Sequence, residues 1–168
     1  MIVFLQARVR AEIADQLGDG GLTNLGDMDR LGYTRQVMDE TLRHTKLASF
    51  SERKAETDME IGGFFIPAGS QIVNALCLAL DEEEYFPNPR QFDPNNCSKE
   101  NVKNLAFSPF GFGVRKCPGY RFANLEMVVA AVEILNRFKI EVCEGEPKVR
   151  PQYGFVTKPD KQVWVKLA

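Results

Sequence analysis

The segment from Phe110 to Ala123 is the one stretch of the chain whose residue types and spacing suggest chemistry. Cys117 stands at the end of a glycine-rich turn, two residues after Arg115, and a helix is expected directly behind it. The free amides at the start of a helix and the positive end of its dipole both favour an anion. This position therefore favours an ionised thiolate, the form of cysteine that binds metals.

The other three cysteines, Cys77, Cys97 and Cys143, lie far from Cys117 and from one another, and no C-x-x-C pair is present. Zinc ribbons, redox dithiols and iron–sulfur modules need neighbouring cysteines, so these classes are disfavoured. The glycines around Cys117 let the backbone approach a bulky, flat group. Of the remaining centres, a haem iron with one thiolate ligand fits best, and a buried structural cysteine is the alternative.

Five positions, Phe110, Gly113, Arg115, Cys117 and Gly119, match the pattern F-x-x-G-x-R-x-C-x-G, which resembles the haem-binding signature of the cytochromes P-450. The resemblance implies that Cys117 is the axial ligand of the haem iron, as is characteristic of that family. It also implies that Arg115 binds a haem propionate and that Phe110 packs beside the sulfur and keeps water from it. Gly113 and Gly119 would let the backbone approach the cofactor.

A second motif, Glu40-Thr-Leu-Arg43, places a carboxylate and a guanidinium three residues apart on one predicted helix face, where they can pair. By itself, E-x-x-R indicates no more than a surface ion pair. Its position before strands, a proline-rich meander and the cysteine loop resembles the order of the K helix, meander and L helix in the P-450 family. The resemblance implies that Glu40 and Arg43 are structural and brace the core beneath the haem.

Arg53 is a second candidate ligand for the haem propionates. It follows Arg43 by the interval at which members of the family place a basic residue against a propionate. Arginine suits this role because it stays ionised and forms bidentate bonds with carboxylates. The alternative is a polar residue in the charged run 52–54.

Three features depart from the family pattern. Asn96 stands where the meander of the family carries an arginine, and an amide can donate to Glu40 but cannot neutralise it. Residues 44–49 lack the prolines that often follow E-x-x-R, which makes this loop resemble the orphan animal group called family 20. The A/G-G-x-[DE]-T pattern that handles oxygen in the family has no counterpart upstream of Glu40, so no catalytic residue is expected in this chain.

Hydrophobic periodicity and turn residues predict the elements that position these motifs. The fold class expected is mainly α with small β-sheets, the C-terminal, haem-ligand part of a cytochrome P-450 fold, with residues 1–168 as one partial domain. Helices are expected at 5–17, 33–43, 78–84 and 118–138, strands at 59–61, 64–66, 71–75, 140–143 and 163–165, and irregular chain at 19–32 and 86–98. The helix at 118–138 is predicted to start at Pro118, because a proline at the first helical position loses no helix bond.

Composition limits the classes of partner. The 168 residues carry a net charge of −2, with 44% apolar and 26% charged residues, which is typical of a globular protein and gives no indication of nucleic-acid binding. No apolar run is long enough to be a membrane anchor or a signal peptide. The chain is shorter than half the usual P-450 length, so we expect the C-terminal portion of a longer protein at the cytosolic face of the endoplasmic reticulum membrane.

Taken together, the resemblance implies the haem-binding part of a haem-thiolate monooxygenase that inserts one oxygen atom from O2 into a small organic substrate. Haem b would be the cofactor, and a flavoprotein reductase would deliver electrons derived from NADPH. The alternative is a non-catalytic truncated fragment or isoform that binds haem weakly or not at all.

Overall fold

The computed structural model describes residues 2–18, 21–22, 24–98, 106–143, 145 and 149–168. Helices and short antiparallel ribbons alternate along the chain, so the prediction of a mainly α fold with small β-sheets is confirmed. The helical elements are α1 (Ile2–Leu17), η2 (Leu25–Arg30), α2 (Gly32–Thr45), α3 (Leu76–Ala79), η3 (Pro94–Cys97), η5 (Gly113–Arg115) and α4 (Tyr120–Arg137). The strands are β1 (Ser51–Lys54), β2 (Met59–Ile61), β3 (Phe64–Ile66), β4 (Gln71–Asn74), β5 (Ile140–Val142), β6 (Pro151–Gln152), β7 (Lys158–Pro159) and β8 (Val165–Leu167).

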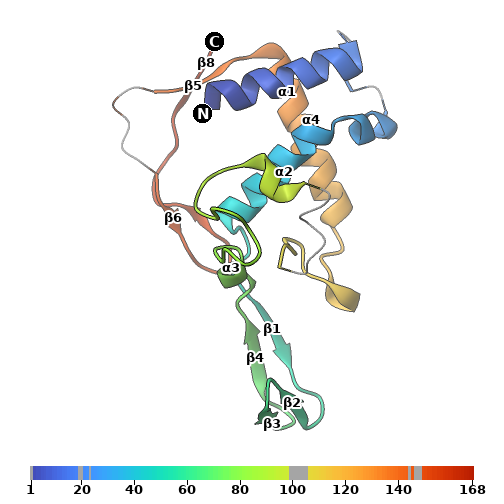
Figure 1. Ribbon diagram of the computed structural model, residues 1–168, viewed down its shortest axis with the longest axis vertical. Helices are drawn as coiled ribbons and strands as arrows, with labels where there is room; N and C mark the ends of the chain where they lie inside the picture. The colour runs from blue at the N-terminus through green and yellow to red at the C-terminus, as the bar shows by residue number, and fades with distance from the viewer. Residues whose placement is uncertain (1, 19–20, 23, 99–105, 144, 146–148) are drawn as a thin grey trace.

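Helices α1, α2 and α4 pack together around the main hydrophobic core (Figure 1). Val9 and Ile13 of α1, Val128 and Val132 of α4, and Leu31 just before α2 belong to one buried cluster. Each of these side chains is at most 3% exposed. Their burial is the largest apolar contribution to the stability of this part of the chain.

Two polar side chains of α1 fix its neighbours. The amide of Gln6 donates to the Ile140 carbonyl at 2.7 Å and accepts from the Ile140 N–H at 2.9 Å, so it acts as a strand partner for β5. The carboxylate of Glu12 accepts from the backbone N–H groups of Tyr33 and Thr34, both at 2.7 Å. A carboxylate at this position accepts hydrogen bonds from free amides and interacts favourably with the positive end of the α2 dipole. Glu12 therefore stabilises the start of α2.

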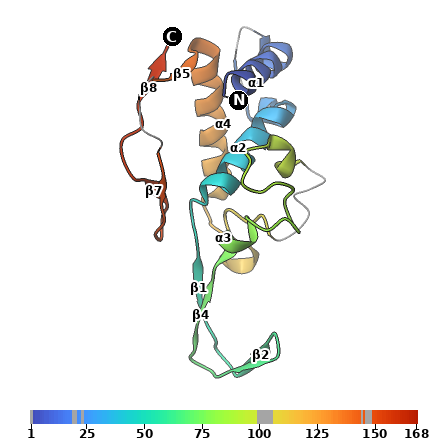
Figure 2. The same cartoon turned by 60° about the vertical axis from the view of Figure 1, so that its left-hand side comes forward.

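A narrow β arm projects from the helices (Figures 1 and 2). Strand β1 pairs antiparallel with β4, with Arg53 opposite Ile72, and β2 pairs with β3 at the far end of the arm. The aromatic side chains of Phe64 and Phe65 near its tip are 73% and 69% exposed. The arm therefore contributes little to the core and presents apolar surface to solvent.

The C-terminal residues form two further ribbons. Strand β5 pairs with β8, and β6 pairs with β7. Thr157 joins the second ribbon to the end of α2, because its N–H donates to the Leu47 carbonyl at 2.8 Å and its hydroxyl donates to the Lys46 carbonyl at 2.7 Å.

Most predicted elements are found within two residues of their expected bounds, but several expectations were wrong in detail. The short helix lies at Leu76–Ala79 rather than at 78–84, and residues 19–32 contain η2. Strand β1 and the ribbon β6–β7 were not expected. The long helix begins at Tyr120 rather than Pro118, because the Tyr120 N–H donates to the Cys117 carbonyl at 3.3 Å and closes a turn ahead of the helix.

Candidate functional site

Cys117 ends a closed loop in front of α4. Its N–H donates to the carbonyl of Phe110 at 2.9 Å, which ties the two ends of the glycine-rich segment together. Gly111 and Gly113 have φ values of 70° and 65°, a region that other residues adopt only with strain. The backbone therefore turns back on itself and leaves the thiol of Cys117 exposed at the surface, as a free cysteine.

Exposed apolar side chains precede and follow this thiol in the sequence, alongside the basic residues of the loop. Phe112 is 46% exposed and Val114 is fully exposed in the loop, and Phe122 in the first turn of α4 is 65% exposed. A side chain at Gly119 would begin 4.0 Å from the Cys117 sulfur, so the glycine keeps space beside the sulfur free. An exposed thiol among uncovered apolar side chains fits a flat, apolar group that brings its own metal.

Phe110 lies beside Tyr120 at the start of α4. It is half-buried, and its ring centroid is 6.4 Å from that of Tyr120. Tyr120 in turn carries the ammonium of Lys116 over its ring at 3.7 Å, and its hydroxyl accepts from Arg121 at 3.0 Å. These contacts hold the loop against the start of α4.

The predicted pair of Glu40 and Arg43 is present and fully buried. Arg43 donates from Nε and Nη2 to the two oxygens of Glu40 at 2.7 and 2.8 Å, a bidentate arrangement in which neither side chain is exposed. The guanidinium also donates to the carbonyls of Leu80 and Pro89, each at 2.8 Å. The pair therefore joins α2 to the irregular segment that follows α3. Burial by itself lowers the pKa of Arg43, but the hydrogen bond and charge of Glu40 outweigh it and raise that pKa above its usual value.

Neutral donors complete the shell around Glu40 on the meander side. The Asp93 N–H donates to Glu40 Oε1 at 2.9 Å, the Asn96 amide approaches the same oxygen at 3.5 Å, and the Cys97 thiol donates to Oε2 at 3.5 Å. Asn96 thus makes the weak bond that an amide can make, and no second guanidinium faces Glu40 among the described residues. Every buried side-chain nitrogen and oxygen in the described part of the chain has a partner.

Cys97 is a member of this network that sequence reasoning missed. Burial, together with the negative charges of Glu40 and Asp39, raises the pKa of the Cys97 thiol, which therefore stays protonated and acts as a donor. The only signal in the sequence was its place directly after Asn96 in the proline-rich segment. Cys97 and Cys117 thus have opposite environments, one buried and hydrogen-bonded, the other exposed.

Arg53 and Arg115 lie on separate elements, β1 and η5. Arg53 is exposed on β1 and donates to the neighbouring carbonyl of Glu52 at 2.7 Å, and Arg115 is exposed in η5. Among the described residues, neither guanidinium pairs with a carboxylate. Both are therefore free to bind an added anion.

A cavity of about 470 Å³ lies behind the cysteine loop and is lined on the α2 side by Asp39. Phe107, Phe110 and Tyr120 form apolar walls, and Lys116 also lines it. Burial raises the pKa of Asp39 to about 6, against the opposing charge of Arg35. Asp39 was not singled out in the sequence, where it is merely the residue before Glu40.

A family model described as cytochrome P450 matches residues 4–165. The chain belongs to the cytochrome P450 family. It is 33% identical to mouse cytochrome P450 3A13 over 97% of this chain, and 34% identical to the probable cytochrome P450 508A1 of Dictyostelium discoideum over 97%. It is also 35% identical to a tomato beta-amyrin 6-beta-monooxygenase over 82%.

The P450 chain spans about a third of the length of these relatives, 34% of the Dictyostelium protein, 33% of the mouse protein and 29% of the tomato enzyme. The expectation of a partial P450 fold agrees with this coverage. A closer affinity to the family 20 group stays a prediction, as does the description of residues 1–168 as one partial domain. In the described part of the chain, none of the helices is long and apolar enough to span a bilayer.

Proposed function

We propose that this chain supplies the haem-binding part of a haem-thiolate monooxygenase, with Cys117 as the axial ligand of the iron. The observation that carries the proposal is the exposed Cys117 thiol at the end of a loop closed by its own N–H, among uncovered apolar side chains. Haem b supplies the chemistry when bound, the activation of O2 and the transfer of one oxygen atom to a small organic substrate.

The residues of the chain would hold and shield the cofactor. Arg115 and Arg53 would bind its two propionates, since their guanidiniums are exposed and have no carboxylate partner among the described residues. The backbone at Gly113 and Gly119 would lie close to the ring, and Phe110 would exclude water from the inner side of the loop.

Electrons would come from NADPH through a flavoprotein reductase. Arg115, Lys116 and Arg121 cluster around the cysteine loop, and Lys116 and Arg121 are held by Tyr120. A basic surface beside the ligand loop is complementary to an acidic partner, so we place the reductase there. The enzyme would act at the cytosolic face of the endoplasmic reticulum membrane.

The carbon-monoxide spectrum of the reduced, haem-loaded chain tests the assignment of Cys117. We expect a red-shifted Soret band of the thiolate type. Cys117→Ser should abolish that band, whereas Cys77→Ser, which changes a half-buried cysteine elsewhere, should keep it. An unchanged thiolate-type band in Cys117→Ser would refute the proposed ligand.

Arg115→Gln and Arg53→Gln should each release haem several-fold faster than Arg121→Gln, because each loses a charge-assisted bond to a propionate.

A second reading, a non-catalytic fragment or isoform with weak or no haem binding, draws support from the exposed surface. The chain has 11822 Å² of accessible surface, whereas a compact monomer of its mass has about 8,300 Å². If the wild-type chain mixed with haem gives no thiolate-type band, this reading replaces the first.

A further inference from the structure

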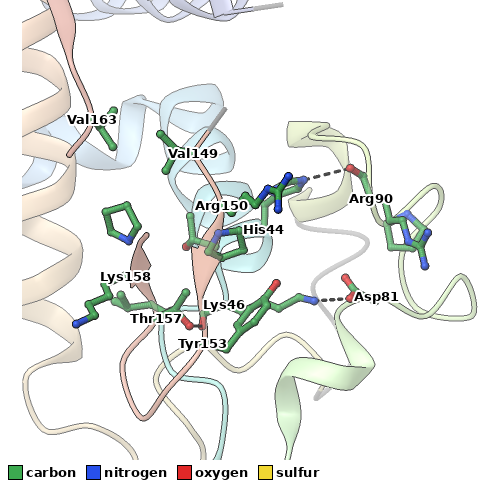
Figure 3. Close-up of a pocket in the computed structure, with 15 residues that line it drawn as sticks. His44, Lys46, Asp81, Arg90, Val149, Arg150, Tyr153, Thr157, Lys158 and Val163 are labelled. Carbon is green, nitrogen blue, oxygen red and sulfur yellow. Dashed lines mark hydrogen bonds and ion pairs between the residues drawn. The ribbon is translucent and has the colours of Figure 1, made fainter. Parts of the chain in front are cut away.

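A second cavity, of about 750 Å³, lies away from the cysteine loop and has no part in the proposed haem site (Figure 3). The end of α2 forms one side of it, and the ribbon β6–β7 with its flanking residues forms the other. Asp81, Pro89 and Arg90 line a third side. Ligand sites of small molecules occupy about 300–1,000 Å³, so this cavity has the size of a ligand site.

The walls of this cavity are joined by specific bonds. Thr157 is 8% exposed and bonds to the carbonyls of Leu47 and Lys46, and its hydroxyl lies 3.1 Å from that of Ser49. Across the cavity, the Lys46 ammonium pairs with Asp81, and Figure 3 shows this pair beside Tyr153. The ribbon is therefore fixed to the helix end, and the space between them is built into the fold.

The lining carries an excess of positive charge in a chain whose net charge is −2. Lys46, Arg90, Arg150 and Lys158 line the cavity, and Asp81 is the one carboxylate among the lining residues. Lys46 and Asp81 neutralise each other. Arg150 and Lys158 form no ion pair within the described part of the chain, although Asp160 accepts the backbone N–H of Arg150 at 2.9 Å.

The rest of the lining is largely apolar. Val149 and Val163 lie at one end in Figure 3, and Tyr153 lies toward the other end, beside Lys46. An apolar wall next to cations without a counter-charge suits a ligand that has one apolar part and one anionic part. A fully polar anion would leave the valines uncovered, and an uncharged apolar molecule would leave Arg150 and Lys158 without a partner.

We propose that this cavity binds an amphipathic organic anion, with its carboxylate at the cationic lining that Arg150 and Lys158 provide and its apolar body against the apolar lining of Val149, Val163 and Tyr153. The site is independent of the haem, because the cavity has no lining residue in the cysteine loop. Its test therefore uses the haem-free chain, and its failure would leave the assignment of Cys117 untouched.

Titration calorimetry of the 168-residue chain with laurate, below its micellar concentration, measures this binding. We expect the Kd of laurate to rise about tenfold or more in the double variant Arg150→Gln/Lys158→Gln, because the carboxylate loses charged hydrogen bonds. The charge-conserving variant Arg150→Lys/Lys158→Arg should stay close to the wild type. Arg137→Gln, an exposed arginine on α4 outside the cavity, is the matched control and should change nothing.

Comparison of ligands on the wild-type chain gives a test that does not depend on how a variant folds. Laurate should bind more tightly than uncharged lauryl alcohol, which has the same apolar chain. Equal affinity for the two ligands, no laurate binding at all, or equal affinity of the double variant and Arg137→Gln would each overturn the proposal.

Discussion

At the scale of single residues, the network around Glu40 is notable for what replaces the expected arginine. Asn96 supplies only a long bond, and the Asp93 N–H and the Cys97 thiol supply the rest. One buried positive charge, that of Arg43, therefore balances the one buried negative charge of Glu40. A buried pair of this kind contributes little net stability but is costly to break, since the remaining charge has no water to solvate it.

Glu40→Gln should accordingly destabilise the chain strongly. It leaves the Arg43 guanidinium buried without a counter-charge, a loss of about 3–5 kcal/mol in the free energy of unfolding. Urea denaturation at pH 7 followed by circular dichroism measures it. Glu133→Gln is the matched control, because Glu133 pairs with Arg137 at the surface, where such a pair is worth at most about 1 kcal/mol. Similar losses in the two variants would contradict the role given to Glu40.

At the scale of elements, α2 is the helix that organises the site. It packs against α1 and α4, begins at the carboxylate of Glu12, and carries Arg43 near its end. Its inner face also places Asp39 behind the cysteine loop, where burial raises the pKa of the carboxyl to about 6 from 3.8. Between these two values the folded chain holds a proton that the unfolded chain has released.

Stability should therefore fall as the pH rises from about 4 to about 6, by roughly 1–2 kcal/mol when the solvent-exposed part of the Asp39 carboxyl is allowed for. Asp39→Asn removes the pH-dependent cost of ionising the Asp39 carboxyl in the folded chain. The variant should therefore be as stable as the wild type near pH 4 and more stable at pH 7. Urea midpoints at the two pH values measure the difference. Asp15→Asn, an exposed change on α1, should show no such trend. If the stability difference between Asp39→Asn and the wild type were the same at both pH values, the prediction would be wrong. Asp39 would then have the same pKa in the folded and unfolded chains.

At the scale of the whole molecule, large apolar side chains are exposed on several elements. The β arm ends in Phe64 and Phe65, the cysteine loop exposes Val114, and Trp164 near the C-terminus is 59% exposed. Uncovered apolar patches of this kind favour association. The haem-free chain is therefore expected to self-associate in solution.

Analytical ultracentrifugation over a range of concentrations tests this expectation. The weight-average sedimentation coefficient of the wild type should increase with concentration, and Phe64→Ser/Phe65→Ser should reduce the increase by removing the apolar tip of the arm. Glu60→Gln, in the same hairpin but without loss of apolar area, is the control. A wild-type chain that remains monomeric at every concentration would contradict the prediction.

The sequence by itself determined most of the elements and the family. Local patterns sufficed, because the spacing of Val9 and Ile13 reflects the period of a helix, and turn residues at Gly62 and Gly63 mark the hairpin. The fixed spacing from Phe110 to Gly119 likewise identified the cysteine loop. These features depend on residues close together in the chain.

Only the tertiary structure decided which residues surround each charge. Besides Arg43, the donors to Glu40 come from residues 93–97, more than fifty positions away, and the cavity at Lys46 needs Thr157 from the C-terminal ribbon. The first turn of α4 was mispredicted for a different, local reason. A proline fits the start of a helix, but the Tyr120 N–H bonds to the Cys117 carbonyl in the preceding turn. Burial, pKa shifts and cavities arise from contacts distant in sequence, so local spacing could not reveal them.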